Sequence, residues 1–365
     1  MQSNLTRLNL IVQTAFLGDL LLSIPLLKRT RELWPEDKIG LVCRKGFGDF
    51  LLKTGVVDFV FEIKKGDEES YAQALVEISK HSIKNLISPH QSFRTGLFCR
   101  KIKADSKVSF SQWWTFIFFN KHVQRDLRLP DALRQMSLLG AFDQKVKAEL
   151  EAYASYEKPF ESDEFGKLPS PPSWGDMSLR SKLMQDAETF ERLKHTYNLE
   201  YKGKTVLIFP GSVWATKRWT CQGFIDTGRK LINEGYEVII MGGPGEELLA
   251  EKVASEIPRA KCLAGKTKVF ESAQLIMHAN LVIGNDSASA HLAAVCDTPL
   301  VAVFGPTVLN LGYRPWGQES YAVEVKGMQC RPCGKHGHNE CPLKTHACMK
   351  EISADDVIKT VHKAL

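Results

Sequence analysis

The chain has 365 residues, of which 44% are hydrophobic and 25% are charged, and its formal net charge at pH 7 is +6. This length exceeds that of one ordinary α/β domain, and the apolar content is sufficient for two hydrophobic cores. The mild positive charge is too small to indicate a nucleic-acid-binding protein, and it suits anionic substrates or a phosphate-rich membrane surface instead.

The first half of the chain alternates between strand-like and helix-like segments. Short β-branched runs and longer stretches with helical period follow one another from Arg7 to about Leu139. This alternation is typical of βαβ units that form a parallel sheet. We expect strands at residues 7–13, 38–43, 57–63 and 84–88 and helices at 19–33 and 71–80.

The second half begins at Thr205 and has the same architecture. The two halves share no fixed-period repeat, which excludes a solenoid. An amphipathic helix with Ser353 as its N-cap is expected at 353–365. The other predicted strands are 205–210, 237–243, 280–285 and 299–305, and the other predicted helices are 222–234, 246–256, 269–278 and 289–296.

A linker is predicted between the halves. Residues 158–176 concentrate Pro, Gly, Ser and acidic residues without any period, which is typical of a connecting segment. We therefore expect an α/β protein with two doubly wound domains. The first is predicted at residues 1–170, joined by the helix at 353–365, and the second at 171–352.

The sequence contains no run of roughly 18 apolar residues, which a membrane-spanning helix needs, and no secretory signal pattern precedes the first strand. We expect a soluble, cytoplasmic protein. The nine cysteines are too dispersed in a chain of this length for a secreted disulfide scaffold, so the five upstream ones are expected to be reduced.

The segment Phe16-Leu17-Gly18-Asp19 connects the first strand to the first helix. In an open parallel sheet, ligands bind outside the carboxyl ends of the strands, so a carboxylate at Asp19 would point into the active site. Asp19 is equally suited to cap its own helix. Capping alone does not explain why Gly18 and Asp19 stand together at the first switch point.

The loop FPGSVWATKRWT, residues 209–220, directly follows the first strand of the second half. Gly211 and Ser212 make a tight turn with free backbone N–H groups, and Lys217 and Arg218 bring two cations to the same loop. Such a loop can hold a diphosphate. The alternative is an ordinary βα loop with solvated charges.

The segment IGNDSASAHLAA, residues 283–294, ends a strand and opens a helix. Small residues at the helix start, among them Ser287 and Ala288, let phosphate oxygens approach the N–H groups and the positive end of the helix dipole. This start is a strong candidate for an anion site. His291 could instead be an ordinary helix histidine, and Asp286 a simple cap.

Three other motifs of nucleotide-binding proteins are missing. The segment 264–267 resembles a P-loop, but Ala260 stands where the motif needs glycine. Residues 242–245 lack the third glycine of a dinucleotide fingerprint, and Pro244 interrupts them. Without an Asp-x-Asp pair to hold Mg²⁺, the charge of a leaving group must be neutralised by cations and a helix dipole.

Four cysteines with three interspersed histidines lie within a short segment near the end of the chain. The first pair has the spacing of zinc ligands, but the later gaps are not those of a standard zinc finger. Thiols packed beneath a loop, or a disulfide formed in air, are the alternatives to structural Zn²⁺. The cysteines are Cys330, Cys333, Cys341 and Cys348.

Cations surround an aromatic run between Arg94 and Arg128. The run is Trp113-Trp114-Thr115-Phe116-Ile117-Phe118-Phe119, and Arg94, Arg100 and Lys101 lie upstream of it. Cations around aromatic residues suit a lipid headgroup interface or a groove for a phosphorylated lipid acceptor. A buried helix with a solvated rim is the alternative.

The chain resembles the ADP-heptose lipopolysaccharide heptosyltransferases, glycosyltransferase family 9. The likeness covers most of the length, and the cysteine run before the last helix is also similar to what many members carry. The segments that carry it are LGDLLLSIPLL at 17–27, PGSVWATKRW at 210–219, GGPGEE at 242–247 and NDSASAHLAAVCDTPLVAVFGPT at 285–307.

The resemblance implies a GT-B fold, with two Rossmann-like doubly wound domains facing across a cleft, and an inverting transfer that requires no metal or other cofactor. The second domain would bind the donor, ADP-heptose. The first domain would bind the acceptor, lipid A carrying Kdo or a growing inner core, so the enzyme would be peripheral at the inner face of the inner membrane. Nucleic acid is not an expected partner.

By the same resemblance, Asp19 matches the general base, Lys217 the cation at the donor phosphates, and Glu246 the acid near the nucleotide ribose. The donor-binding residues would be Gly211, Ser212, Thr216, Lys217, Glu246, Asp286, Ser287, Ala288 and His291. The candidate acceptor-binding residues are Gly18, Arg94, Arg100 and Lys101.

One position departs from the family pattern, because Ala288 stands where members usually have glycine. The extra methyl group could narrow the phosphate pocket or shift the choice of donor sugar. Two further functions fit the same residues: an epimerase acting on a nucleotide sugar, which would release free sugar without an acceptor, and a non-catalytic module that binds a nucleotide sugar or lipid A. The retained Gly18-Asp19 pair beside a complete donor loop argues against the second.

Overall fold

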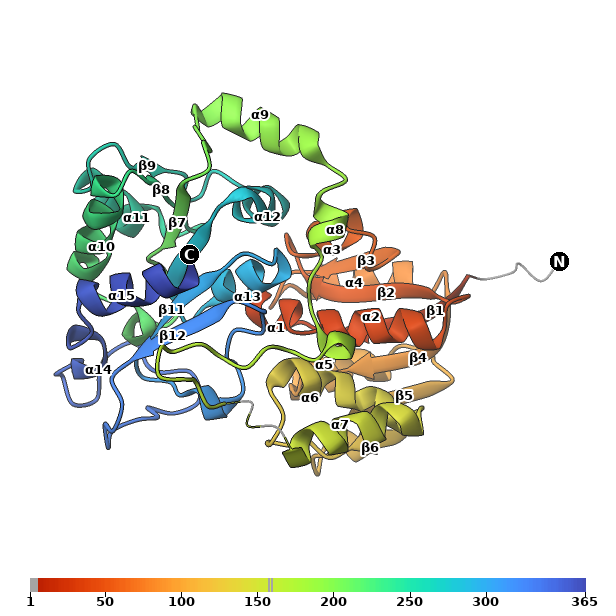
Figure 1. Ribbon diagram of the computed structural model, residues 1–365. Coiled ribbons are helices and arrows are strands. Elements are labelled where there is room, and N and C mark those ends of the chain that lie inside the picture. The colour runs from red at the N-terminus through yellow and green to blue at the C-terminus, as the bar shows by residue number, and fades with distance from the viewer. Residues whose placement is uncertain (1–5, 157, 159) are drawn as a thin grey trace. The chain divides into compact units, whose positions relative to one another are not determined.

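The computed structural model describes residues 6–156, 158 and 160–365. The chain divides into two compact units, drawn in red to yellow and in green to blue in Figure 1. Unit 1 comprises the described residues of 1–157 together with 173–175, and unit 2 comprises those of 158–172 and 176–365. Each unit is an α/β domain built on its own sheet.

The sheet of unit 1 has six parallel strands in the order β3-β2-β1-β4-β5-β6. The central strand β1 is buried from its second residue onward, and Leu10 pairs with Gly40 on one side and with Leu86 on the other. A parallel strand covered on both faces needs such a continuous apolar run. The strands are β1 (Arg7–Val12), β2 (Lys38–Arg44), β3 (Phe59–Ile63), β4 (Ser82–Ser88), β5 (Ser106–Phe110) and β6 (Lys121–Val123).

The helix expected at 19–33 is two helices in the structure. Ser23 is the N-cap of the second, and Pro25 lies in its first turn, where the missing N–H of proline costs no hydrogen bond. The helices of unit 1 are α1 (Leu17–Leu21), α2 (Ile24–Leu33), α3 (Gly48–Lys53), α4 (Glu68–Ile78), α5 (Phe93–Arg100), α6 (Asp131–Met136) and α7 (Gln144–Tyr156), with 3₁₀ helices η1 (Thr115–Ile117), η2 (Ser137–Ala141) and η3 (Ser173–Gly175).

The sheet of unit 2 repeats this topology, with six parallel strands in the order β12-β11-β10-β7-β8-β9. Val282 of β10 pairs with Leu207 of β7 and with Leu300 of β11. The strand order therefore reverses between β7 and β10, as it does between β1 and β4 in unit 1. The strands are β7 (Thr205–Phe209), β8 (Glu237–Ile240), β9 (Lys261–Cys262), β10 (Leu281–Asn285), β11 (Leu300–Phe304) and β12 (Ser320–Glu324).

The five predicted helices of unit 2 begin and end within one residue or so of the predicted bounds, whereas α8, α9 and α14 were not predicted. Thr220 caps α10 by accepting a hydrogen bond from the Gly223 N–H, as expected of a threonine N-cap. The α-helices are α8 (Arg180–Leu183), α9 (Ala187–Tyr197), α10 (Cys221–Asn233), α11 (Glu247–Ser255), α12 (Val269–His278), α13 (Ala288–Val295), α14 (Ala347–Lys350) and α15 (Ala354–Ala364). The 3₁₀ helices are η4 (Ala215–Lys217) and η5 (Leu309–Leu311).

The predicted linker is partly a strand partner. Lys167 forms an antiparallel bridge with Tyr321 of β12, and the Leu168 N–H donates to the Ser320 carbonyl at 2.8 Å. The composition of this segment predicts no pairing, but the open edge of β12 supplies backbone partners. The boundary of unit 1 therefore falls at residue 157 rather than at 170.

The helix α15 belongs to unit 2, which corrects the expectation that it joins the first domain. It packs on α10, β11 and β12, and Val357 and Val361 are fully buried in the core of unit 2. The Ser353 cap is confirmed, because the Ser353 hydroxyl accepts a hydrogen bond from the Asp356 N–H. The amphipathic pattern predicts that one face is buried but not which sheet covers it.

The fold class is confirmed: each unit is a doubly wound, Rossmann-like α/β domain. The facing of the two domains across a cleft stays a prediction. Among the described residues, no helix combines the length and apolar character needed to cross a bilayer.

Replacement of Val357 by alanine tests the place of α15. Because Val357 is fully buried in the core of unit 2, we expect Val357→Ala to lower the free energy of unfolding of unit 2 by about 1–3 kcal/mol. Lys359→Ala on the exposed face of the same helix is the matched control and should change it by less than about 0.5 kcal/mol. If chemical denaturation shows the same change in the free energy of unfolding for Val357→Ala and Lys359→Ala, the assignment of α15 to this core is wrong.

Candidate functional site

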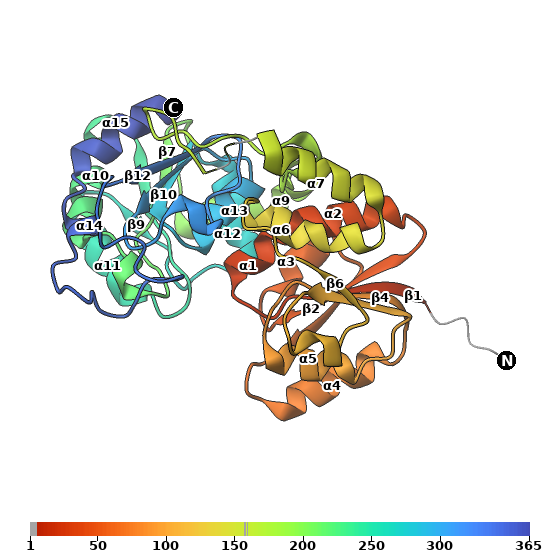
Figure 2. The ribbon, with the colours of Figure 1, turned by 90° about the horizontal axis from the view of Figure 1, so that it is seen from below.

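The predicted site residues lie at the switch points of the two sheets. In unit 1, the segment that follows β1 leads to Asp19 in α1. In unit 2, the loop after β7 contains Lys217, and the segment after β10 contains Asp286 and opens α13, which lies against β10 (Figure 2). The carboxyl ends of strands at a switch point are where open α/β sheets bind ligands.

Asp19 is the third residue of α1. Its Oδ2 accepts a hydrogen bond from the Phe16 N–H at 3.2 Å; Phe16 is the N-cap, so Asp19 helps cap the helix from its third position rather than as the N-cap residue. Burial and, to a smaller extent, the nearby negative charge of Asp131 raise the pKa of Asp19 to about 6. A carboxyl with a pKa near the working pH is suited to general-base chemistry, so capping and catalysis are compatible at this residue.

A buried amide fixes the backbone beneath Asp19. Gln135 Nε2 donates to the Asp19 carbonyl at 3.1 Å and to Asp131 Oδ2 at 2.8 Å. Gln135 Oε1 accepts from Gln13 Nε2 at 3.0 Å and from Ser23 Oγ at 2.9 Å. Sequence reasoning missed Gln135 and Asp131, because no local pattern joins α6 to a segment more than a hundred residues upstream.

A neutral histidine lies at the other side of the same switch point. The hydroxyls of Thr14 and Thr95 lie 2.8 and 2.9 Å from His90 Nδ1. Burial lowers the pKa of His90 to about 4, assisted by the positive charges of Lys65 and Arg44. His90 is therefore uncharged at neutral pH and can serve as a hydrogen-bonding group but not as an anion's counter-ion.

The candidate acceptor residues separate into two places. Gly18 adjoins Asp19, and Arg94 is exposed in the first turn of α5, near the carboxyl end of β4. Arg100 and Lys101 lie at the other end of α5, where the Arg100 carbonyl accepts a hydrogen bond from the side chain of Lys107 at the start of β5. That end faces the amino edge of the sheet, so Arg100 and Lys101 do not join Asp19.

The aromatic run is partly exposed and does not form an α-helix: Phe118 and Phe119 are buried in the core of unit 1. Trp113, Phe116 and Ile117 are 85%, 63% and 62% exposed. The run contains only the 3₁₀ helix η1, held by the buried Thr115, whose hydroxyl donates to the Phe110 carbonyl at 3.1 Å. The alternative of a buried helix with a solvated rim is therefore correct only for the buried end of the run, and Trp113, Phe116 and Ile117 form an exposed apolar surface.

The donor loop of unit 2 is tied to β10 by one side chain. Asn285 Nδ2 donates to the carbonyls of Pro210 and Gly211 at 2.9 and 3.2 Å, and its Oδ1 accepts from the Trp219 N–H at 2.8 Å. Asn285 is fully buried. Because its hydrogen bonds reach Pro210 and Gly211 at one end of the loop and Trp219 at the other, it fixes both ends of the loop. The sequence marks it as the end of a strand but gives no sign of this role.

Gly211 and Glu246, both predicted donor residues, lie side by side. A Cβ added at Gly211 would lie 2.2 Å from the carboxyl carbon of Glu246, so a larger residue there would displace the Glu246 carboxylate. The Gly243 N–H donates to Glu246 Oε2 at 2.8 Å. The loop after β8 thus places a carboxylate beside the loop after β7, at the same edge of the sheet.

Lys217 forms an ion pair with Asp286. Lys217 Nζ lies 2.6 Å from Asp286 Oδ2, and the Thr307 hydroxyl donates to the same oxygen at 2.6 Å. The lysine and aspartate side chains are 12% and 6% exposed. Two donors therefore engage the Asp286 carboxylate, which reduces its repulsion of an anion at this edge.

The start of α13 has the features predicted for an anion site. The N-cap Ser287 is extended, and its hydroxyl lies 2.8 Å from that of Ser289. Ala288 is the first helical residue and has no left-handed backbone angle, so the conformation does not require the glycine usual in the family. His291 is buried in the same helix. Ser212 and Thr216 are buried in the loop opposite.

The cysteines near the end of the chain do not form a ready metal centre. Among the residues that the structure describes, no three or more His, Cys, Asp or Glu side chains are placed to hold a metal ion. The nine cysteines are free thiols. The expectation of structural Zn²⁺ at Cys330, Cys333, Cys341 and Cys348 is therefore not supported by their placement.

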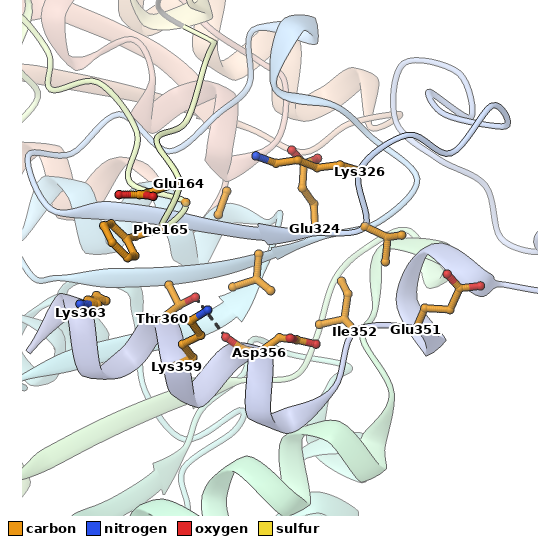
Figure 3. A pocket seen from close by; sticks show the side chains of 14 residues that line it. Glu164, Phe165, Glu324, Lys326, Glu351, Ile352, Asp356, Lys359, Thr360 and Lys363 are labelled. Atoms are coloured by element: carbon orange, nitrogen blue, oxygen red, sulfur yellow. Dashed lines mark hydrogen bonds between the residues drawn. The ribbon is translucent and has the colours of Figure 1, made fainter.

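A cavity of about 270 Å³ lies elsewhere in unit 2, between β12, α15 and the segment around Phe165 (Figure 3). Its rim mixes charges of both signs, such as Glu324, Lys326 and Lys363. The lining contains none of the predicted site residues, and such a mixed rim does not select an anion.

Two Rossmann-like domains of the same strand order in one chain are the architecture of the GT-B class of α/β proteins. The chain belongs to glycosyltransferase family 9 (heptosyltransferase), whose family model matches residues 84–344.

Individual relatives agree with this assignment. The chain is 30% identical over 190 residues to lipooligosaccharide heptosyltransferase 2 of Campylobacter jejuni, which covers 48% of this chain and 58% of that protein. It is 35% identical over 167 residues to lipopolysaccharide heptosyltransferase 3 of Escherichia coli, covering 44% and 46%. The matches span about half the length of these relatives. The structure of E. coli ADP-heptose lipopolysaccharide heptosyltransferase II superposes with a TM-score of 0.76 at 16% identity and covers 98% of both chains, which shows the shared fold.

Asp19→Asn should stabilise the protein at neutral pH but not in acid. The pKa of Asp19 is raised from 3.8 to about 6, so the folded state binds the proton more tightly than the unfolded state. The stability contributed by this carboxyl is present below about pH 4 and is lost as the pH rises through about 6. Denaturant unfolding should show a gain for the variant at about pH 7.5 and none at about pH 3.5.

Asp49→Asn is the matched control for this measurement. Asp49 is also in the first turn of a short helix, but its side chain is 51% exposed beside Lys53. It should show no gain at either pH. A gain for Asp19→Asn that persists in acid would contradict the raised pKa.

Proposed function

We propose that this protein is an inverting glycosyltransferase that moves heptose from ADP-heptose to lipid A carrying Kdo, or to the growing inner core of lipopolysaccharide. Its membership of glycosyltransferase family 9 supports this assignment, as do the names of the lipooligosaccharide and lipopolysaccharide heptosyltransferases that it resembles. The observation that carries the proposal is the placement of Lys217 beside Asp286 and the start of α13, at the switch point of unit 2.

This edge of unit 2 would hold the diphosphate of the donor. The first N–H groups of α13 have no helical partners and point outward with the positive end of the helix dipole. Lys217 adds a full positive charge at the same place, and Glu246 beside Gly211 would accept hydrogen bonds from the nucleotide ribose. Lys217 and α13, rather than a bound metal ion, would neutralise the charge that develops on the departing ADP.

Asp19 of unit 1 would act as the general base. Its pKa of about 6 leaves most of the carboxyl ionised at pH 7 while keeping it basic enough to take a proton. As Asp19 removes the proton of the acceptor hydroxyl, the hydroxyl oxygen bonds to the anomeric carbon of the heptose. The bond from that carbon to the ADP oxygen breaks on the opposite face, so the configuration inverts and ADP leaves.

Asp19→Asn tests this assignment. We expect it to lower kcat by roughly 10²- to 10⁴-fold while the Kd for ADP changes less than twofold, because the amide cannot take the proton. In the unsubstituted protein, kcat/KM should fall about tenfold per pH unit below about pH 6, as Asp19 becomes protonated. Transfer is measured with ADP-heptose and a lipid A–Kdo acceptor.

Controls separate this function from its alternatives. Release of free sugar from ADP-heptose without an acceptor would favour the epimerase. Binding of ADP-heptose with no turnover of any kind would favour the non-catalytic module. Unchanged kcat in Asp19→Asn would reject the general base while leaving the donor site intact.

The exposed part of the aromatic run supports a peripheral position at the membrane that holds the acceptor. Trp113, Phe116 and Ile117 present apolar side chains to solvent, and Arg94 on the neighbouring α5 is also exposed. Phe93 of α5 contacts Trp114 of the run, with ring centroids 5.8 Å apart. Apolar side chains next to cations suit the interface of an anionic bilayer.

Trp113→Ser combined with Phe116→Ser should weaken binding to vesicles that contain anionic phospholipid by at least about tenfold, because two large apolar side chains no longer enter the interface. The Kd for ADP should not change. Leu248→Ser in unit 2 is the matched control, since Leu248 is 85% exposed, as Trp113 is. The membrane contact would be refuted if the unsubstituted protein, the double variant and Leu248→Ser bind vesicles equally in a sedimentation assay.

A further inference from the structure

The residue before Lys217 is held by a segment more than a hundred residues away. The Thr216 N–H donates to the His338 carbonyl at 3.1 Å. The Thr216 hydroxyl donates to that same carbonyl at 2.7 Å and accepts from the His338 N–H at 2.8 Å. Finally, the Thr216 carbonyl lies 2.8 Å from His346 Nε2. All the polar atoms of this buried threonine are thus bonded to the cysteine-rich segment, residues 328–350.

The geometry defines the role of His346 in these contacts. A carbonyl oxygen can only accept, so His346 Nε2 carries the hydrogen and donates it. The backbone of His346 is left-handed, with φ of 52°, at the N-cap of α14. This conformation directs the imidazole back to the donor loop from the turn that follows Cys341, whose sulfur accepts the His346 N–H at 3.4 Å.

The same segment also reaches the other half of the ion pair. Arg331 Nη2 donates to the Thr307 carbonyl at 2.7 Å, and the Cys333 N–H donates to the Pro306 carbonyl at 2.8 Å. Thr307 is the residue whose hydroxyl binds Asp286. The cysteine-rich segment therefore fastens both the loop that carries Lys217 and the loop that supports Asp286.

We propose that the cysteine-rich segment positions Lys217 for the donor diphosphate by clamping Thr216, and that His346 is the positioning residue of this clamp. The inference rests on the proposed function, in which Lys217 binds the diphosphate. Lys217 has a flexible four-carbon stem, so the accuracy of its ammonium depends on how firmly the backbone of η4 is held. A misplacement of about 1 Å at a reacting group can cost up to about a hundredfold in rate.

His346→Ala should weaken the binding of ADP about three- to tenfold, which is the range expected for one lost hydrogen bond and a less rigid loop. It should change the affinity for adenosine, which has no phosphate, less than twofold. His346→Gln places an amide N–H near the position of Nε2 and should restore most of the ADP affinity. Both affinities are measured by calorimetry or by competition with ADP on the full chain.

Lys344→Ala is the matched control, because Lys344 is exposed and has the same left-handed backbone, with φ of 57°. It should leave both affinities unchanged, which separates loss of the imidazole from strain of alanine at such a position. If His346→Ala fails to fold, Thr216→Val tests the same clamp, since it removes the hydroxyl and keeps the shape. Thr216→Val should likewise weaken the binding of ADP and leave the affinity for adenosine unchanged.

A double-mutant cycle with Lys217→Ala decides between positioning and general destabilisation. Since His346 acts through Lys217, His346→Ala should cause little further loss of ADP affinity once Lys217 is alanine. The positioning role would be rejected if the losses of ADP affinity in the two single variants add fully in the double variant. It would also be rejected if the affinities for ADP and adenosine fall equally. If Lys217→Ala itself leaves ADP binding unchanged, the donor site of the proposed function fails instead.

Discussion

The ion pair between Lys217 and Asp286 is the interaction on which the proposed donor site of unit 2 depends. Its members come from the loops after β7 and β10, which are neighbours only because the strand order reverses there. Each member is supported from outside its own loop, Asp286 by the Thr307 hydroxyl and the Lys217 loop by Asn285. The pair is nearly buried, so an incoming phosphate would meet a lysine already fixed in place and little reorganisation would be needed to stabilise the leaving group.

Unit 1 uses the same topological position for the opposite chemistry. Where unit 2 gathers a cation and helix N–H groups, unit 1 gathers a carboxyl whose pKa is raised to about 6 by burial and by Asp131. The amide of Gln135 donates to both Asp131 and the carbonyl of Asp19. Asp131, whose charge disfavours ionisation of the Asp19 carboxyl, is therefore itself fixed in position. Burial of this carboxyl is unfavourable for stability at neutral pH, which is characteristic of a functional residue rather than a structural one.

Much of the fold could be predicted from the sequence, because parallel strands covered on both faces are continuous apolar runs that end at polar residues. Asp19, Lys217 and Asp286 could be proposed as site residues for the same reason, because each lies in the segment that directly follows such a run. Gln135 and the bracing role of Asn285 were not, since their partners are distant in sequence and amides have no distinctive pattern. The place of α15 was mispredicted because amphipathicity shows that a face is buried but not what covers it.

The cysteine-rich segment illustrates a different reason why composition can mislead. The spacing of its thiols suggests a metal centre, yet the thiols lie in unlike surroundings. Burial raises the pKa of Cys348 to about 11, whereas backbone N–H groups led by that of His346 lower the pKa of Cys341. The segment contacts the donor loop mainly through the backbone atoms of His338 and through two imidazoles, that of His346 and that of His336, which stacks on Trp214. Backbone donors and acceptors are present at every residue, so a contact surface made of them leaves no trace in the sequence, and only the fold can show which loop it supports.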